Sequence, residues 1–361
     1  MQKRLPYISL GQFPTPIHPL DTLTKELGVQ LYIKRDDLSG GIYGGNKVRK
    51  LEFILADALK SKARTVITYG GAGSNHALAT AIYARQLGLE CISILALQPN
   101  AYHVRENLLL NHHFGASIHL CSAYPHQRKI KLMMSEATEN YKKLLSGHSP
   151  YVIPFGGSSP LGSVGFVNAA FELKDQIANN ILEEPDFIYV ACGTVGTAAG
   201  LILGCKIADI RSQIVPILVI EDNRTDYLLM ELIYRTNSRL CSLDTSFPEV
   251  EIMGKDIYIR KDFFGQQYAL FTERGMEAVG EMQKKEGIKL EGTYTGKAFS
   301  AIIHDAKSGA LSGKVILFWN TVNSKDFRNI VNTIDYHNLP RSFHRFFTQE
   351  VQPLDRKTIK N

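Results

Sequence analysis

The sequence predicts an α/β protein with two interleaved domains, each an open, mostly parallel sheet flanked by helices. Two observations lead to this prediction. Short apolar runs alternate with helical stretches along the chain, and glycine-rich turns precede several of the helices. Strands joined by helices are typical of parallel sheets, because the chain must cross over before it can re-enter the sheet in the same direction. The alternation resumes after Gly156-Gly157, and we see no internal repeat.

The individual elements follow from these patterns. After an extended, proline-rich opening at residues 13–20, the apolar runs that predict strands are Leu31–Lys34, Thr65–Tyr69, Cys91–Leu97, Ser117–Leu120, Tyr151–Pro154, Phe187–Ala191, Ile214–Ile220 and Lys314–Trp319. Helices are predicted at residues 20–27, 51–59, 75–87, 103–113, 127–145, 162–180, 197–210, 224–236, 270–285 and 297–308. We expect a large domain of residues 1–50 plus 160–361 and a small α/β domain of residues 51–159. Residues 336–361 are polar and predict a surface tail.

Composition bounds the possible functions. The 361 residues are 44% hydrophobic and 21% charged, which is ordinary for a globular protein of one large or two medium domains. The net charge of +6 is spread along the chain without a run of like charges. It indicates at most an affinity for small anions, and no basic-aromatic stripe or motif predicts nucleic-acid binding.

Five dispersed cysteines without a Cys-x-x-Cys motif argue against a disulfide framework or a metal site and for a reducing compartment. The N-terminus lacks the apolar core of a signal peptide, and no apolar run is long enough to cross a bilayer. We therefore expect a cytoplasmic protein without membrane contact.

The turn Gly44-Gly45-Asn46-Lys47 delivers a lysine between a strand and a helical pattern. Glycines let the backbone approach a ligand closely, and a partly desolvated lysine held in this way can form a Schiff base with an aldehyde. Lys50 is its nearest competitor and is expected to face a charged neighbour. A solvated lysine in a flexible turn is the alternative for this segment alone.

Two further glycine–serine turns stand before helices. The first, residues 70–76, ends in Ser74, Asn75 and His76, where Ser74 or Asn75 can cap the following helix and the helix N-terminus favours an anion. The second, residues 156–162, contains Ser158 and brings polar side chains to a ligand. Each turn alone is also compatible with an ordinary strand–helix connection.

The loop Gly193-Thr194-Val195-Gly196-Thr197 lies between a buried strand and an alanine-rich helix. Its backbone amides and threonine hydroxyls can hold a phosphate at the positive end of the helix. A dinucleotide fold is the alternative, since Glu221 stands where a ribose-binding acid is expected, although the G-x-G-x-x-G spacing is missing. That alternative would make the protein a nicotinamide dehydrogenase.

Tyr268 and Tyr294 complete the candidate site. Tyr294 lies in a turn of small residues before a helix, where a tyrosine can stack on a flat ring and offer a polarised hydroxyl. Together these segments require a flat aldehyde that carries a phosphate and lies near a lysine. Pyridoxal 5'-phosphate meets that requirement.

The same segments resemble a known family. Residues 34–37, 44–52, 70–76, 156–158 and 294–297 are similar, in order, to the D-cysteine desulfhydrase and 1-aminocyclopropane-1-carboxylate deaminase family. The family belongs to the fold type II, tryptophan synthase β-like group of pyridoxal phosphate enzymes. The resemblance runs from about Phe13 to Trp319. It implies a homodimer that acts on a small amino acid.

The resemblance also implies roles for individual residues. Lys47 would form the Schiff base with the cofactor, and residues 193–197 would hold its phosphate. Asn75 would hydrogen-bond the ring hydroxyl, with Ser74, His76 and Ser158 near the substrate. Tyr294 would stack on the ring, and Tyr268 would approach the substrate from the other side.

Two positions bear on the reaction. The deaminases carry a glutamate after the stacking tyrosine, whereas this chain has Thr295, which favours β-elimination of D-cysteine over opening of a carbon ring. The family's His-Thr-Gly-Gly turn is replaced by residues 320–324, Asn-Thr-Val-Asn-Ser. The alternatives are therefore a 1-aminocyclopropane-1-carboxylate deaminase, a deaminase or racemase of another small amino acid, or a pyridoxal phosphate-binding homologue without catalysis.

Overall fold

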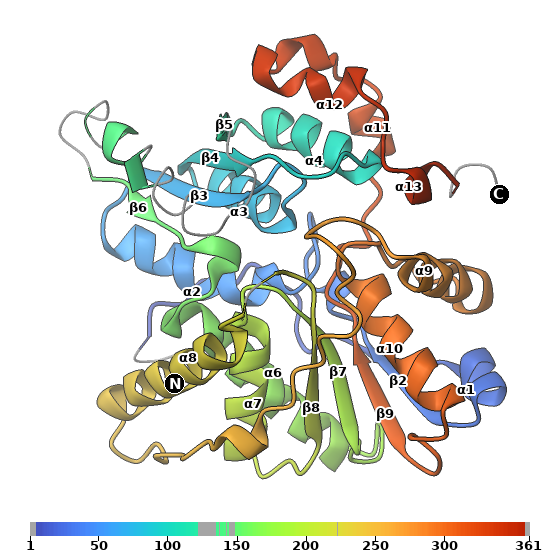
Figure 1. Ribbon diagram of the computed structural model, residues 1–361. Coiled ribbons are helices and arrows are strands. Elements are labelled where there is room, and N and C mark those ends of the chain that lie inside the picture. The colour runs from blue at the N-terminus through green and yellow to red at the C-terminus, as the bar shows by residue number, and fades with distance from the viewer. Residues whose placement is uncertain are drawn as a thin grey trace. The chain divides into compact units, whose positions relative to one another are not determined.

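The computed structural model describes residues 5–121, 135–136, 138–141, 143, 149–221 and 223–357 (Figure 1). The chain divides into two compact units. The first unit consists mainly of residues 11–50 and 158–324, and the second contains residues 6–10, the described residues of 51–157 and those from 325 onward. Both units are therefore built from separate stretches of chain. Among the described residues, no helix has both the length and the apolar composition to cross a lipid bilayer.

The first unit contains a five-stranded sheet in the order β1-β2-β9-β7-β8. All neighbouring strands are parallel except β1, which is antiparallel to β2 at the edge. The strands are β1 (Ile17–Pro19), β2 (Gln30–Lys34), β7 (Phe187–Cys192), β8 (Gln213–Leu218) and β9 (Val315–Trp319). The predicted mostly parallel α/β sheet is confirmed for this unit. β9 is buried along its whole length, because a strand with helices on both faces meets apolar side chains on each side.

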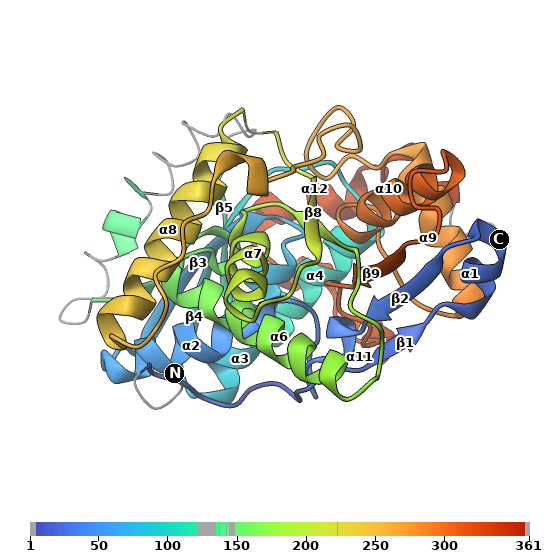
Figure 2. The same cartoon turned by 90° about the horizontal axis from the view of Figure 1, so that it is seen from below.

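Helices cover both faces of this sheet (Figures 1 and 2). The helices of the first unit are α1 (Asp21–Leu27), the start of α2 (Lys47–Lys60), α6 (Pro160–Ala178), α7 (Gly196–Ile207), α8 (Thr225–Leu243), α9 (Glu273–Glu286) and α10 (Thr295–Lys307), with short 3-10 turns at Asp36–Leu38 and Gly254–Asp256. Alternate strand residues such as Ile33, Val215 and Phe318 pack with Leu23, Phe299 and other side chains of α1, α9 and α10 in one apolar core. The two-residue alternation of the strands thus decides which helices each side chain meets.

The second unit contains a fully parallel four-stranded sheet in the order β5-β4-β3-β6. Its strands are β3 (Thr65–Gly71), β4 (Glu90–Ala96), β5 (Ser117–Cys121) and β6 (Tyr151–Val152), and its helices before residue 121 are the rest of α2, α3 (Asn75–Gln86) and α4 (Tyr102–His113). A 3-10 turn follows at Phe155–Gly157. Most of the helix predicted at 127–145 lies outside the described residues, and its described residues are helical.

The C-terminal segment is not the surface tail that its polar composition predicts. It forms α11 (Arg328–Val331), α12 (Arg345–Thr348), α13 (Pro353–Lys357) and 3-10 turns at Tyr336–Asn338 and Arg341–Phe343. Its apolar residues Leu339, Phe343, Phe346 and Val351 are buried. The prediction was wrong because these few apolar residues are spaced by polar ones that stay exposed. Residues 325–357 belong to the second unit, whereas the sequence pattern places them in the large domain.

Two side chains hold this segment by donating hydrogen bonds to its backbone carbonyls. Asn100 Nδ2 donates to the carbonyls of Phe346 (2.8 Å) and Gln349 (2.9 Å), and Arg105 Nε donates to Phe346 (2.8 Å). The last carbonyls of α12 have no partner within so short a helix, so these two side chains satisfy them.

Candidate active site

The lysine turn follows β2 and a 3-10 turn and leads directly into α2, which begins at Lys47 rather than at the predicted residue 51. Gly45 has a positive φ of 94°, which a side chain would disfavour. A Cβ on Gly44 would stand 2.0 Å from the carbonyl oxygen of Asp37. The two glycines therefore allow the tight approach that starts the helix early, and Lys47 becomes its first residue.

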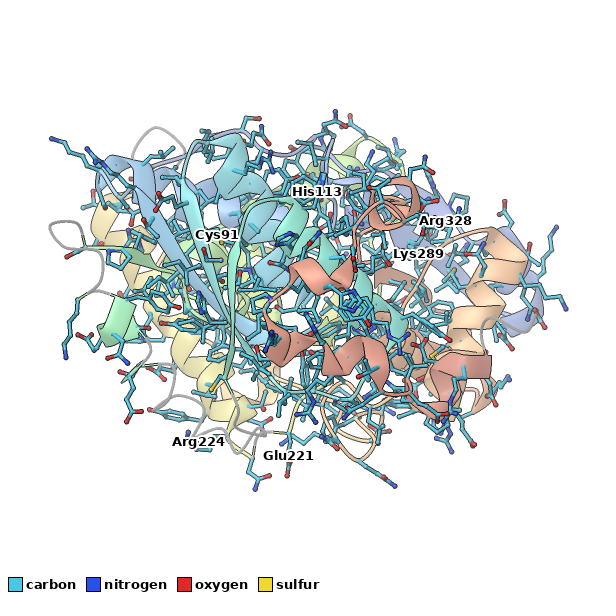
Figure 3. The ribbon with its side chains drawn as sticks, turned by 90° about the horizontal axis from the view of Figure 1, so that it is seen from above. Cys91, His113, Glu221, Arg224, Lys289 and Arg328 are labelled. Carbon is cyan, nitrogen blue, oxygen red and sulfur yellow. The ribbon has the colours of Figure 1, made fainter. Side chains whose placement is uncertain are left out.

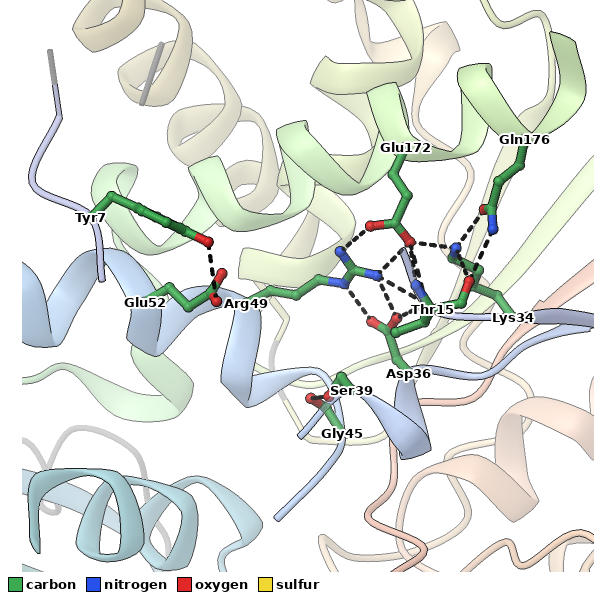
Figure 4. A network of polar contacts seen from close by, with 10 residues as sticks. All are labelled: Tyr7, Thr15, Lys34, Asp36, Ser39, Gly45, Arg49, Glu52, Glu172 and Gln176. Carbon is green, nitrogen blue, oxygen red and sulfur yellow. Dashed lines mark hydrogen bonds and ion pairs between the residues drawn. The ribbon is translucent and has the colours of Figure 1, made fainter. Parts of the chain in front are cut away.

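A buried ionic network holds the first turn of α2 (Figure 4). Arg49 donates to both carboxylate oxygens of Asp36 (2.9 and 2.8 Å) and to both of Glu172 (2.8 and 2.9 Å). Lys34 Nζ lies 2.5 Å from Glu172 Oε1 and donates to the carbonyl of Thr15 (2.7 Å). The network joins β2, α2 and α6, and so fixes the rotation of α2 about its axis.

The charges of this network shift one another. Burial alone would raise the pKa of Glu172, but the charges and hydrogen bonds of Arg49 and Lys34 lower that pKa to about 2. Burial lowers the pKa of Lys34 to about 8, although the negative charge of Glu172 acts to raise that pKa. Glu172 thus stays ionised at neutral pH.

The unusual turn at residues 320–324 contacts the lysine turn. Gly44 N donates to Asn323 Oδ1 at 2.7 Å, and Asn46 N donates to the carbonyl of Thr321 at 3.1 Å. Val322 is buried beside Gly45, where a Cβ would stand 3.3 Å from the Val322 carbonyl carbon. The residues that depart from the family pattern therefore support the lysine turn, with an amide side chain where the family has a glycine.

The loop at residues 193–197 forms a polar cradle at the N-terminus of α7. Ser158 Oγ accepts a hydrogen bond from Gly196 N (3.1 Å) and lies 2.8 Å from Thr194 Oγ1. Val195 adopts a left-handed φ of 59°, which is strained for a β-branched residue. A Cβ on Gly196 would stand 2.5 Å from Ser158 Oγ, so only glycine fits there. Strain of this kind is common at ligand-binding turns.

Two contacts join the lysine turn to this cradle. Asn46 Nδ2 donates to Thr197 Oγ1 at 2.9 Å, and Lys50 Nζ lies 3.4 Å from Ser158 Oγ. Lys50 is one helical turn after Lys47, so both side chains lie on the same face of α2. Sequence reasoning named Lys50 only as a competitor of Lys47 that faces a charged neighbour, and did not assign it to the cradle, although the three-residue spacing was the signal for it.

Burial controls the charge of both lysines. It lowers the pKa of Lys47 to about 8. Burial, and then repulsion by the charge of Lys47, lower the pKa of Lys50 well below its usual value. An anion beside Lys50 would relieve this cost, because it would supply the opposite charge.

A tyrosine pair lies beside the same cradle. The hydroxyls of Tyr268 and Tyr294 are 2.6 Å apart, and their rings meet edge to face with centroids 6.3 Å apart. Tyr294 Cε1 would lie 3.9 Å from a Cβ on Gly193. Burial, then its neighbour Tyr268, raise the pKa of Tyr294 well above its usual value. Both tyrosines are therefore neutral hydrogen-bonding groups at physiological pH.

Thr295 begins α10 and is fully buried. Glu291 accepts hydrogen bonds from the backbone N–H groups of Thr293, Tyr294 and Thr295 at 2.8–2.9 Å, and its carboxylate lies 3.3 Å from Thr295 Oγ1. The carboxylate caps the helix start, where negative charge is favoured. It also fixes the position of Tyr294.

The turn with Ser74, Asn75 and His76 belongs to the second unit, where it connects β3 to α3. Ser74 Oγ accepts a hydrogen bond from Ala77 N (3.2 Å), which confirms the predicted cap. His76 is buried, and Asn75 is the first residue of the helix. Asn107 of α4, which sequence reasoning did not identify, donates to Asn75 Oδ1 at 3.0 Å.

In the first unit, the segments predicted from the sequence meet at one edge of the sheet. The lysine turn, the 193–197 loop and the 320–324 turn follow the carboxyl ends of β2, β7 and β9, where ligands bind in parallel α/β sheets. The half-buried Lys47, the 193–197 cradle and the Tyr268–Tyr294 pair lie together there. This combination defines an α/β enzyme that uses a phosphorylated cofactor.

Comparison with known proteins agrees with this class. Residues 8–321 match the family described as pyridoxal-phosphate dependent enzymes. The D-cysteine desulfhydrase of Yersinia enterocolitica is 33% identical over 81% of this chain and 88% of its own. A protein of Pyrococcus furiosus, provisionally named 1-aminocyclopropane-1-carboxylate deaminase, is 33% identical over 88% of this chain and 92% of its own. The crystal structure of a homologue of that deaminase superimposes with a TM-score of 0.77 at 33% identity, covering 92% and 97% of the two chains.

The chain therefore belongs to the pyridoxal-phosphate dependent enzyme family, in the group that contains D-cysteine desulfhydrase and 1-aminocyclopropane-1-carboxylate deaminase. The predicted family and fold type are confirmed. The dinucleotide alternative is wrong, and Glu221, on which it depended, is exposed at the surface (Figure 3).

Proposed function

We propose that this enzyme is a lyase that carries out α,β-elimination on a small amino acid, with D-cysteine as the leading substrate. The products would be pyruvate, ammonia and sulfide. The observation that carries the proposal is Thr295, a neutral hydroxyl held at the start of α10 where the deaminases of this group carry a glutamate. The names of the desulfhydrase relatives agree with it.

The residues of the first unit fit the cofactor. The cradle of Gly193, Thr194, Val195, Gly196 and Thr197 would hold the phosphate, because it combines a helix N-terminus with two hydroxyls and a glycine that leaves no room for a side chain. Ser158 and Lys50 would complete it. Burial and the charge of Lys47 lower the pKa of Lys50, and a phosphate dianion beside Lys50 would raise that pKa again and restore its positive charge.

The ring of the cofactor would lie against Tyr294, with Thr295 as the partner of its pyridine nitrogen. In the second unit, Asn75 would bind the ring hydroxyl, and Ser74 and His76 would receive the carboxylate of the substrate. Tyr268, whose hydroxyl is tied to that of Tyr294, would approach the substrate and steady its leaving group.

Lys47 would act as the base. With its pKa lowered to about 8, a useful fraction of its amine is unprotonated at neutral to mildly basic pH and can accept the proton from Cα. The bound cofactor supplies the electron sink for the charge left on Cα. The C–S bond then breaks, the sulfur leaves as a thiolate and is protonated, and hydrolysis of the released enamine gives pyruvate and ammonia.

A neutral Thr295 hydroxyl would polarise the pyridine nitrogen only weakly, since a hydroxyl cannot hold a proton there as a carboxylate can. A cofactor ring that withdraws electrons weakly is sufficient when the leaving group is a thiolate. It is less suited to breaking a carbon–carbon bond. This argument separates D-cysteine from the cyclopropane acid.

Deamination of 1-aminocyclopropane-1-carboxylate is the second candidate, favoured by the name of the Pyrococcus relative. We also propose that the protein is a cytoplasmic homodimer. The support is the five cysteines, which are all free, and the resemblance to dimeric enzymes.

The test begins with Lys47→Ala. We expect the purified wild-type protein to be yellow, and borohydride reduction followed by peptide mapping should recover the cofactor on Lys47. The Lys47→Ala variant should lose both this linkage and turnover. The matched control is Lys50→Met on the same helix face, which should keep the linkage on Lys47 and bind the cofactor more weakly.

Wild-type protein is then assayed with D-cysteine, L-cysteine, D-serine and the cyclopropane acid. Fastest release of pyruvate and sulfide from D-cysteine supports the proposal. Ring opening as the fastest reaction would replace it with the second candidate, and a fully active Lys47→Ala variant would rule out both.

A further inference from the structure

The turn before α3 is held by one amide side chain from α4. Asn107 is buried, and its Nδ2 donates both to the carbonyl of Gly73 (2.9 Å) and to Asn75 Oδ1 (3.0 Å). A Cβ on Gly73 would stand 2.8 Å from Val104 of the same helix, so the turn and α4 are in close contact. Asn107 therefore reaches the backbone and the side chain of the turn at once.

These two contacts determine which way the amide of Asn75 faces. A backbone carbonyl can only accept a hydrogen bond, so the Asn107 atom facing Gly73 must be the amide nitrogen. The same nitrogen faces Asn75, and a donor requires an acceptor, so Asn75 presents its oxygen to Asn107. The amide nitrogen of Asn75 is thereby turned away from Asn107 and fixed as a donor.

Asn107 is itself held in place. The backbone carbonyl of Asn107 accepts a hydrogen bond from Asn111 Nδ2 at 2.8 Å, one turn further along α4. On the other side of the turn, Gly73 N donates to Gln98 Oε1 at 3.0 Å. Both backbone groups of Gly73 are thus occupied, which leaves the turn little freedom to rotate the Asn75 side chain.

We propose that Asn107 is a positioning residue that holds Asn75 with its N–H group directed to the ring hydroxyl oxygen of pyridoxal phosphate. The proposal rests on the cofactor contact of Asn75 given under the proposed function. It adds the orientation of that contact: the cofactor oxygen accepts, and the enzyme therefore favours its deprotonated form.

The test compares two cofactors on the full-length protein stripped of its own. One is pyridoxal 5'-phosphate, and the other is the analogue that lacks the ring hydroxyl. Asn107→Asp has the same shape but cannot donate, so Asn75 should turn its amide over. Loss of one hydrogen bond predicts about tenfold weaker binding of pyridoxal phosphate and unchanged binding of the analogue.

Asn111→Asp is the matched control, since it is the same substitution on the same buried face of α4. Its amide donates to the Asn107 backbone and not to Asn75. We expect it to leave the ratio of the two affinities within about twofold of wild type. Equal weakening of both cofactors by Asn107→Asp, or no weakening, would overturn the positioning role.

Asn75→Asp provides a second variant if Asn107→Asp does not fold. Its carboxylate still accepts from Asn107, but it offers no donor to the cofactor. The preference for pyridoxal phosphate over the analogue should then disappear or reverse, and a preserved preference would overturn the proposal. Failure of the wild-type protein to bind pyridoxal phosphate at all would instead contradict the proposed function, and the inference with it.

Discussion

The two turns that present the candidate catalytic groups are held in different ways. The lysine turn is followed by Arg49, which lies in a buried network of charges with Asp36, Glu172 and Lys34. The turn before α3 is held by neutral amides, those of Gln98 and Asn107. One turn is fixed by ion pairs and the other by dipoles.

The difference has a physical consequence for each turn. Buried charges are costly unless every one is paired, so the network around Arg49 is either complete or strongly destabilising. Removing one partner of a neutral amide costs less free energy of unfolding. Because one end of an amide donates and the other accepts, an amide also determines the direction of its neighbour's hydrogen bond. The charged network therefore fixes where the helix of Lys47 lies, and the amide pair determines what Asn75 can donate.

The largest effect is expected from Arg49→Met. It removes the guanidinium that forms ion pairs with both Asp36 and Glu172, and leaves a buried and a half-buried carboxylate with less compensation. We expect the free energy of unfolding to fall by about 3–5 kcal/mol, measured by urea denaturation followed by circular dichroism.

The matched control removes an exposed pair. Arg235 and Glu231 lie 3.4 Å apart on the surface of α8, and Glu231→Gln should change the free energy of unfolding by less than about 0.5 kcal/mol. If Arg49→Met cost no more than this control, the network would not anchor α2.

A pH titration tests the charged network, because Glu172 changes its protonation state at low pH and the neutral amides of the other turn do not. The pKa of Glu172 is lowered to about 2, below its unfolded value of 4.5, so the unfolded chain binds more protons between these limits. The stability contributed by Glu172 is therefore complete above pH 4.5 and is lost as the pH falls towards 2. Wild type should lose stability more steeply than Glu172→Gln over this range, as measured by urea midpoints at successive pH values. Parallel curves for the two proteins would contradict the prediction.

A smaller effect is expected from Asn323→Ala. Gly44 N would lose its acceptor, and an unsatisfied buried N–H group costs about 1–3 kcal/mol of unfolding free energy. Asn323→Gly, which restores the family pattern, should lose as much, whereas Asn323→Asp keeps an acceptor oxygen and should lose less. The same denaturation experiment measures all three, and an Asn323→Gly protein as stable as wild type would show that the side chain is dispensable.

Local patterns were sufficient for most of the fold. The apolar run from Val315 to Trp319 and the glycine turn at residues 193–197 follow from side-chain periodicity and backbone freedom, which are properties of neighbouring residues. The fully parallel sheet of the second unit follows from the same alternation.

What the sequence could not provide is pairing over long distances. Glu172 meets Arg49 across 123 positions, and Asn107 meets Asn75 across 32. No local pattern marks such partners, because polar residues on helices are usually solvated. The burial of Phe343 and Phe346 was missed for the same reason, since the segment that carries them is bonded to Arg105, which lies 241 positions away from Phe346 in the sequence.

The docked C-terminal segment determines how short this protein can be made. The match to the enzyme family ends at residue 321, and a gene trimmed at that point would keep the lysine turn, the 193–197 cradle and the tyrosine pair but lose Asn323, which supports Gly44. It would also remove the buried rings of Phe343 and Phe346 and the carbonyls to which Asn100 and Arg105 donate hydrogen bonds. The folded part of the chain therefore extends beyond the end of the family match, at least to α13, which ends at Lys357.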